Sequence, residues 1–116
     1  MKNKNILLEK ADTFVHLVYS LSKSFPREEM FGVTSQLRRA VLSLPLNITE
    51  GFARQSKKEY KRFLEIAYAS LKEVKYLLYF SYIERYLLEK DYKKSLNLAD
   101  ELGKMLWTSI QTLKEK

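Results

Sequence analysis

Apolar residues recur at steps of three and four along almost the whole chain, and this spacing limits the fold more than any other feature. Such steps place side chains on one face of an α-helix and leave the other face polar. Only three glycines and two prolines occur in 116 residues, so few turns are available to separate short strands. The pattern therefore predicts an all-α fold of long helices joined by short turns.

Interruptions in the pattern divide the chain into four helices. Pro26 predicts the first break, because the residue before a proline avoids helical geometry. Ser56, with Glu59 three residues later, has the capping-box spacing that opens a helix, and Asp91 is the expected N-cap of the last helix. The expected helices span residues 5–24, 27–54, 57–88 and 92–114. We expect a single domain over residues 1–116, folded as an antiparallel up-down-up-down four-helix bundle.

Each expected helix has an apolar stripe that a bundle would bury. The first two stripes are Leu7, Leu8, Ala11, Phe14, Val15, Val18 and Leu21, and Val33, Leu37, Ala40, Val41, Leu44, Ile48 and Phe52. The other two are Tyr60, Phe63, Leu64, Ala67, Leu71, Val74 and Leu78, and Leu98, Leu102, Met105, Leu106, Ile110 and Leu113. Together these residues are the predicted hydrophobic core.

A proline interrupts the second helix in the stretch "LSLPLNITEG". Pro45 lacks an N–H group and its ring clashes with an earlier carbonyl, so we expect the helix to bend there. The apolar stripe keeps its phase across the proline, which predicts that the helix continues. Ser43 and Asn47 are near enough to satisfy backbone groups that a bend would free. Gly51 lacks a side chain on the core-facing side, so a neighbouring helix can approach closely there.

Five polar residues, at steps of three and four, form one edge of this helix: Arg39, Ser43, Asn47, Glu50 and Arg54. Glu50 is the least explained of them. We expect it to form an ion pair with an arginine of a neighbouring helix or subunit, such as Arg62.

The chain is strongly basic. It contains 21 lysines and arginines against 14 acidic residues, which gives a formal net charge of +7. A positive field of this kind attracts polyanions, of which nucleic acid, either RNA or DNA, is the obvious candidate. The alternative interpretation is that a lysine-rich helical surface only keeps the protein soluble.

Basic residues are densest between Arg54 and Lys75. Tyr68 and Tyr76 lie on the same outer side, so cations for phosphates and rings for base stacking would lie close together. The alternative is a solvated face with pairs such as Lys61 with Glu65. The predicted phosphate contacts are Arg38, Arg39, Arg54, Lys57, Lys58, Lys61 and Arg62.

Two helix faces that should meet solvent are apolar. The first is the outer side of the second helix, and the other is the stretch "YLLYFSYIERYLL" in the third. In a bundle of this size only one face of each helix can meet the core, so we expect these outer faces to contact another subunit. The predicted interface residues are Leu42, Leu46, Tyr76, Tyr79, Phe80, Ile83 and Leu87. A homo-oligomeric ring would repeat the basic patch around it.

Residue types that support catalysis or metal binding are scarce. The chain has no cysteine, and its single histidine, His16, has no partner at ligand spacing, so we expect it at the surface of the first helix. The glycines are isolated, so no phosphate-cradling loop is predicted. We therefore expect no enzyme activity, no metal and no cofactor. We also expect no membrane-spanning segment, and a cytoplasmic location because a cysteine-free chain suits a reducing compartment.

A resemblance to a known family lies in "FGVTSQLRRAVLSLPLNITEGFARQSKKEYKRFLEIAYASLKEV", residues 31–74. The patterns T-S-Q-L-R-R-A, P-x-N-I-x-E-G and S-x-x-E-x-x-R-F-L-x-I-A occur there in order. In order and spacing they resemble the signature of the bacterial four-helix-bundle proteins encoded in intervening sequences of 23S ribosomal RNA genes. Leu46 and Thr49 depart from the usual residues of that signature.

The resemblance implies a non-enzymatic four-helix bundle. Its matching polar or special positions are Arg38, Arg39, Asn47, Glu50 and Gly51. A more distant resemblance to the accessory variability proteins of diversity-generating retroelements implies a pentamer that associates with nucleic acid and a reverse transcriptase.

Two functions follow from these observations. The first is an oligomeric, nucleic-acid-associated bundle. The second is a structural or protein-interaction module, such as an accessory subunit of a reverse transcriptase, whose apolar outer faces assemble and whose charge only confers solubility.

Overall fold

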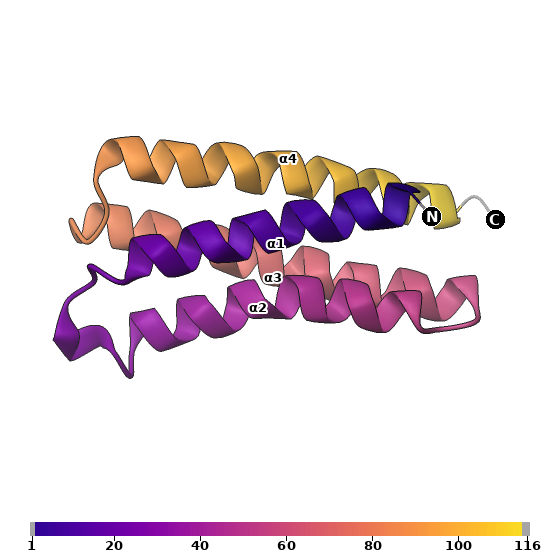
Figure 1. Cartoon of the computed structure of the whole chain (residues 1–116), viewed down its shortest axis with the longest axis horizontal. Coiled ribbons are helices and arrows are strands. Elements are labelled where there is room, and N and C mark those ends of the chain that lie inside the picture. The colour runs from indigo at the N-terminus through magenta and orange to yellow at the C-terminus, as the bar shows by residue number, and fades with distance from the viewer. Residues whose placement is uncertain (1, 115–116) are drawn as a thin grey trace.

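The computed structural model describes residues 2–114, with side chains described from residue 6 onward. It contains four α-helices and one short 3-10 helix, with no strand in the described part of the chain: α1 (Lys2–Ser22), η1 (Arg27–Glu29), α2 (Val33–Phe52), α3 (Lys57–Ile83) and α4 (Glu89–Lys114). The molecule measures 45 × 25 × 19 Å. Figure 1 shows the α1–α2 and α3–α4 connections at one end, and the α2–α3 connection at the other, near both chain termini.

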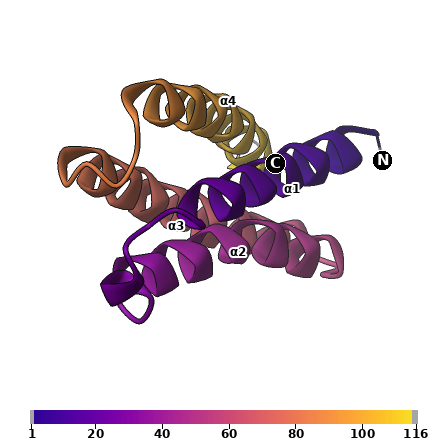
Figure 2. The same cartoon turned by 60° about the vertical axis from the view of Figure 1, so that its left-hand side comes forward.

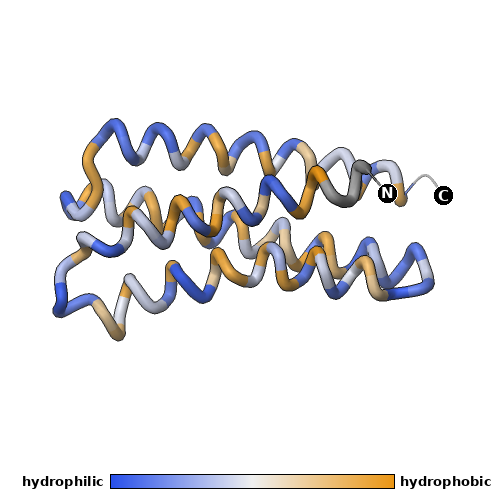
Figure 3. The backbone as a smooth tube through the Cα atoms, viewed as in Figure 1, coloured by the Kyte–Doolittle hydropathy of each residue, from blue (hydrophilic) through white to orange (hydrophobic). Residues whose placement is uncertain are grey.

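Each helix packs against two others. Contacts join α1 to α2, α2 to α3, α3 to α4 and α4 back to α1, whereas α1 and α3 share no contact among the described residues. The two views in Figures 1 and 2 show this arrangement around a common axis. Hydrophobic and hydrophilic segments alternate along each helix (Figure 3), as expected for helices with one buried side.

The predicted core is confirmed in nearly every position. Phe14, Leu37, Leu64 and Leu106 are fully buried, and the remaining stripe residues are buried or half-buried. The stripes lead to this result because each is wide enough to face two neighbouring helices at once. The prediction of an all-helical, four-helix fold is therefore correct.

Helix α2 continues through Pro45, as predicted. The Asn47 side-chain amide donates a hydrogen bond to the Ser43 carbonyl at 2.8 Å. This bond adds a side-chain link across the helical turn that contains Pro45. The predicted role of the Ser43 side chain is wrong, because its hydroxyl donates instead to Ser70 on α3 at 2.5 Å. Ser43 therefore links two helices.

Gly51 lets α3 approach α2 closely, as predicted. A Cβ atom added there would lie 2.9 Å from Cδ1 of Tyr60 and 3.3 Å from Cβ of Phe63. Both neighbours belong to the first turns of α3, so a side chain at Gly51 would push the two helices apart at this end of the bundle.

The prediction that the second helix begins at residue 27 is wrong. Residues 27–29 form η1, and α2 begins only at Val33, after Gly32. Glu29 explains the boundary, because its Oε1 accepts a hydrogen bond from the Val33 N–H group at 3.1 Å and so caps α2 from the preceding turn. Its Oε2 accepts a hydrogen bond from the Tyr86 hydroxyl at 2.8 Å, which ties the α1–α2 connection to the α3–α4 connection.

The third helix ends at Ile83, five residues before the predicted end. Arg85 adopts a φ of 67°, which reverses the chain. The N–H of Arg85 donates to Tyr82 O at 3.0 Å and that of Tyr86 donates to Ser81 O at 2.8 Å. This is the hydrogen-bond pattern of a Schellman motif, in which glycine is the usual left-handed residue. The sequence carries arginine there, so the usual stop signal is missing.

This early reversal changes two further predictions. Helix α4 begins at Glu89, so Asp91 lies inside its first turn and is not the N-cap. Leu87, a predicted interface residue, turns inward and is only 5% exposed. Leu87 belongs to the core because it lies in the α3–α4 connection and not on a longer α3.

Candidate functional site

Four lysines surround a hollow at the end of the bundle that carries the α2–α3 connection. Lys57, Lys58 and Lys61 come from the start of α3, and Lys114 comes from the end of α4, with Leu113 completing the lining. We call these four lysines the basic end. Lys61 pairs with Glu65 at 3.7 Å, as the alternative of a solvated face expects, whereas Lys57 and Lys58 have no carboxylate partner among the side chains described. Within residues 6–114, the lining therefore presents four ammonium groups, of which that of Lys61 is paired.

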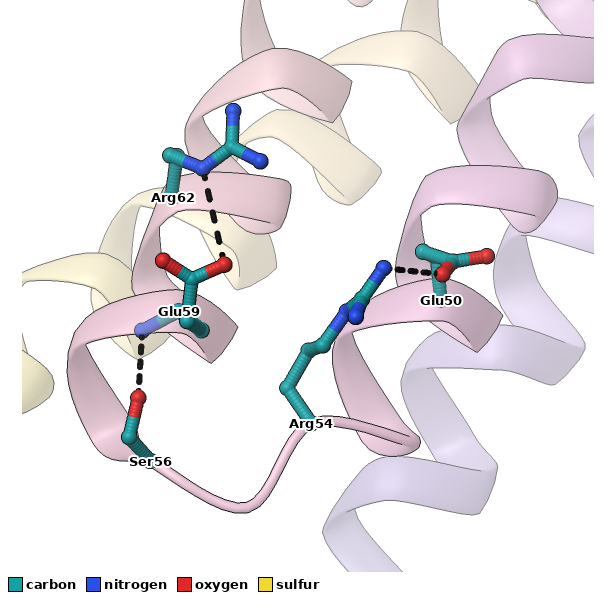
Figure 4. A network of polar contacts seen from close by, with 5 residues as sticks. All are labelled: Glu50, Arg54, Ser56, Glu59 and Arg62. Atoms are coloured by element: carbon teal, nitrogen blue, oxygen red, sulfur yellow. Dashed lines mark hydrogen bonds and ion pairs between the residues drawn. The ribbon is translucent and has the colours of Figure 1, made fainter.

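The start of α3 places these lysines. Ser56 is the N-cap, and its hydroxyl accepts a hydrogen bond from the Glu59 N–H group at 3.1 Å (Figure 4). This half of the predicted capping box is confirmed. The Glu59 carboxylate does not serve the other half, because it lies 3.7 Å from Nε of Arg62. Lys57 and Lys58 thus occupy the first turn of a capped helix, where the macrodipole adds to their positive potential.

The predicted pair between Glu50 and Arg62 is wrong. Glu50 of α2 pairs with Arg54, four residues later in the α2–α3 connection, and Arg62 pairs with Glu59, as Figure 4 shows. Both arginines also lie over the ring of Phe63, at 4.9 Å for Arg54 and 4.8 Å for Arg62. The ring gathers the two guanidinium groups beside the α2–α3 connection, while each arginine remains paired with a carboxylate three or four residues earlier in the chain.

Arg38 and Arg39 lie away from the basic end. They are about 20 Å along α2 from its last residue, Phe52, from the rise of about 1.5 Å per residue. Arg38 turns toward α1, where its Nε donates to the Ser22 hydroxyl at 2.8 Å and its guanidinium lies 4.8 Å from the Tyr19 ring centroid. Arg39 lines a separate hollow between α2 and α3 together with Glu73. The structure therefore brings three of the seven predicted phosphate contacts, Lys57, Lys58 and Lys61, into one hollow, and it places Arg54 and Arg62 together over the Phe63 ring.

A groove between α3 and α4 contains a residue that the sequence prediction missed. Trp107 is 52% exposed and packs against Tyr68, with ring centroids 5.9 Å apart. Lys72 lies 5.1 Å above the Tyr68 ring, so this predicted stacking ring is already covered on one face. The helical phase of Trp107, off the inner stripe of α4, was the available signal.

The predicted interface residues, apart from Leu87, remain outside the core. Leu46, Tyr76 and Ile83 are more than half exposed, at 65%, 62% and 53%. Leu42 lines a hollow with Val15, His16 and Tyr19 of α1, whereas the pair Tyr76 and Tyr79 lies on α3. The exposed apolar residues therefore form one group on α2, beside α1, and another on α3.

His16 lies at the surface of α1, as predicted, and pairs with Asp12 one turn earlier at 3.3 Å. Within residues 2–114, none of the helices is both long enough and apolar enough to cross a bilayer.

Comparisons with known proteins give one family. Residues 3–108 match the model of the 23S rRNA-intervening sequence protein family. A similar solved structure is described as a protein with unknown function from the S23 ribosomal protein family of Bacteroides thetaiotaomicron. It is 25% identical, with a TM-score of 0.87 over 94% of this chain and 98% of that one. No curated protein matches the sequence at a significant level. Because the family model spans nearly the whole chain, this protein belongs to the 23S rRNA-intervening sequence protein family.

Proposed function

We propose that this protein is a non-enzymatic module that binds RNA or DNA through its basic end. The observation that carries the proposal is the hollow lined by Lys57, Lys58, Lys61 and Lys114, where Lys61 alone has a carboxylate partner, Glu65, among the side chains described. Cations brought together in this way repel one another, and a bound phosphate relieves that repulsion. Phosphate contacts of this kind supply affinity and position, without reading base sequence.

The placement of Lys57 and Lys58 strengthens this argument. Cations in the first turn of a helix oppose its macrodipole, which costs about 0.3–1 kcal/mol for each exposed charge. The same turn favours an anion, because its backbone N–H groups point out of the helix. Lysines here therefore contribute little to folding, and their positions favour an anionic ligand.

Charge reversal with a matched control tests the proposal. Lys57→Glu, Lys58→Glu and Lys61→Glu would be combined in one variant, and Lys90→Glu, Lys93→Glu and Lys94→Glu in the other. Both sets lie in the first turns of a helix, and each contains one lysine in an ion pair, Lys61 with Glu65 and Lys93 with Glu89. The two variants therefore differ in position and not in charge.

Fluorescence anisotropy with labelled RNA and DNA, over a series of salt concentrations, gives the readout. We expect wild-type affinity to fall with salt, and the first variant to lose more than about tenfold while the control loses much less. Equal losses in both variants would mean that only net charge matters. The stability of the first variant should be unchanged or raised, since glutamates suit the start of a helix.

The two apolar patches favour a second candidate, self-assembly. The α3 patch of Tyr76, Tyr79 and Ile83 is 62%, 48% and 53% exposed. It belongs to a different helix from Leu42 and Leu46, which lie on α2. Contact between unlike patches of two copies is head-to-tail, and such contacts form a ring when the rotation between copies closes. A ring would also repeat the basic end, so weak phosphate contacts would add.

The distant resemblance to accessory variability proteins extends this candidate to a pentamer with a reverse-transcriptase partner, and the cysteine-free chain supports a cytoplasmic location. Light scattering measures the oligomer directly. A strict monomer at micromolar concentration would contradict self-assembly, and Leu46→Glu combined with Ile83→Glu should dissociate a true oligomer.

A further inference from the structure

The groove between α3 and α4 has the size of a ligand site. Its volume is about 630 Å³, within the range of about 300–1,000 Å³ that is typical of small-molecule pockets. Gly103 keeps its floor low, because a Cβ atom there would already lie 3.3 Å from Cδ2 of Leu71. The groove is open to solvent along its length, which suits a chain-like ligand better than an enclosed small molecule.

One aromatic ring in the groove is available to a ligand. Tyr68 contacts Trp107 at an interplanar angle of 43° and has Lys72 over its ring, so it supports the indole and positions the lysine. Trp107 itself is 52% exposed. Exposure of half an indole forgoes burial of a large apolar surface, and such exposed rings are characteristic of binding surfaces.

Lysines lie on both sides of this ring. Lys72 and Lys75 come from α3 and Lys104 from α4. Asp100 is the acidic residue of the lining, and it pairs with Lys75 at 2.7 Å, so its charge is neutralised within the groove. Lys72 and Lys104 keep their charges for a ligand.

The groove also continues toward the basic end. Lys61, Tyr68, Lys72 and Lys75 follow one another on α3 at steps of seven, four and three, which places them on one face. Lys114 lies seven residues beyond Trp107 on α4, again on one face. From Lys61 to Lys75 the rise of the helix is about 21 Å. Cations, an exposed ring and further cations therefore lie in sequence along one surface.

We propose that a single strand of nucleic acid runs along this groove, with one unstacked base on the exposed face of Trp107. Its phosphates would lie near Lys72 and Lys104 and would continue to the basic end. A duplex cannot use Trp107 in this way, because its bases are already stacked and paired. The groove thus gives the protein a preference for single strands. This inference rests on the proposed function, to which it adds the form of the ligand.

Trp107 supplies its own assay, because it is the only tryptophan in the chain. Titration of the wild-type protein with single-stranded oligouridylate, single-stranded oligothymidylate and a duplex should quench its fluorescence with one or both single strands and little with the duplex. The RNA and DNA arms identify the preferred backbone. Quenching needs no substitution, so this result does not depend on the folding of a variant.

Affinity measurements on variants complete the test. We expect Trp107→Leu to weaken single-strand binding by about tenfold and duplex binding little, whereas Trp107→Phe retains a ring and most of the affinity. Phe31→Leu is the matched control, since Phe31 is 93% exposed in the connection before α2, far from the groove.

The outcomes separate the two proposals. Binding of single strands with unchanged Trp107 fluorescence, or equal affinity of Trp107→Leu and wild type, would overturn the groove and leave the basic end as the binding site. Failure of the wild type to bind any nucleic acid would overturn both proposals.

Discussion

The two ends of the bundle are closed by different means. At the α2–α3 end a side chain caps the helix, because Ser56 accepts the Glu59 N–H group, and the neighbouring lysines remain exposed. At the other end the backbone closes α3 through the Schellman motif at Arg85, and side chains tie the two connections together. We therefore expect the first end to tolerate charge changes and the second end to be more sensitive to substitution.

Charge follows the same division. Between Arg54 and Arg62 the only acidic residue is Glu59. At the other end, Glu84, Glu89 and Asp91 are interspersed among the basic residues that precede and open α4. Like charges therefore accumulate at the first end and alternate with acidic residues at the second. The following predictions test how strictly the second end is structural.

The largest effect is expected at Leu87. Leu87→Ala removes a side chain that is 5% exposed, and we expect a loss of about 3 kcal/mol in the free energy of unfolding. Leu88→Ala is the matched control, because Leu88 is 64% exposed and its loss should change stability by no more than about 0.5 kcal/mol. Urea unfolding of both variants measures the difference. Similar values for the two would mean that Leu87 is not part of the core.

A smaller effect, of opposite sign, is expected at Arg85. Its φ of 67° is unfavourable for a residue with a side chain, and glycine adopts it without that cost. Arg85→Gly should therefore raise the free energy of unfolding by about 0.5–1 kcal/mol, after allowance for the greater freedom of glycine in the unfolded chain. Glu84→Gly, at a φ of −78°, should give no such gain. Thermal unfolding would distinguish them, and destabilisation by Arg85→Gly would argue against the left-handed turn.

The smallest effect concerns pH. The hydrogen bond to Glu29, followed by desolvation and nearby carboxylates, raises the pKa of Tyr86 from 10.0 to about 12. A raised pKa favours the protonated phenol in the folded state. Its contribution to stability is therefore complete below pH 10 and is lost as the pH rises from 10 to 12.

Comparison with Tyr86→Phe isolates this contribution. Between pH 10 and 12, the free energy of unfolding should fall more steeply for wild type than for Tyr86→Phe, because other titrating groups are common to both. Parallel curves over this window would show that the Tyr86–Glu29 bond does not couple to folding.

The sequence predicted the parts of the fold that depend on local spacing. The four apolar stripes, the continuity through Pro45, the close approach at Gly51 and the Ser56 cap all follow from residues a few positions apart. The α3–α4 connection could not be predicted in the same way. The left-handed backbone conformation of Arg85 cannot be recognised from its residue type, because glycine is the usual residue there. The predicted end of α3 therefore lies too far along the chain.

The site was predicted only in part, for a related reason. Lys57, Lys58 and Lys61 are close in the sequence and remain close in the structure. Glu50 was expected to pair with an arginine of a neighbouring helix or subunit, such as Arg62, and only the tertiary structure decides that Arg54 is the partner. Trp107 can be recognised as part of a site only from its contact with Tyr68, which lies 39 positions earlier in the chain.

The sequence by itself determined the helices, their buried faces, the positive charge and the family resemblance, because all of these depend on residue type and on helical periodicity. Only the tertiary structure decided which charges pair, that Leu87 belongs to the core, and that Trp107, Tyr68 and the lysines share one groove. Periodicity is a property of a single helix, whereas these contacts depend on how two helices are rotated and shifted against each other. Packing of the whole bundle sets that rotation and shift.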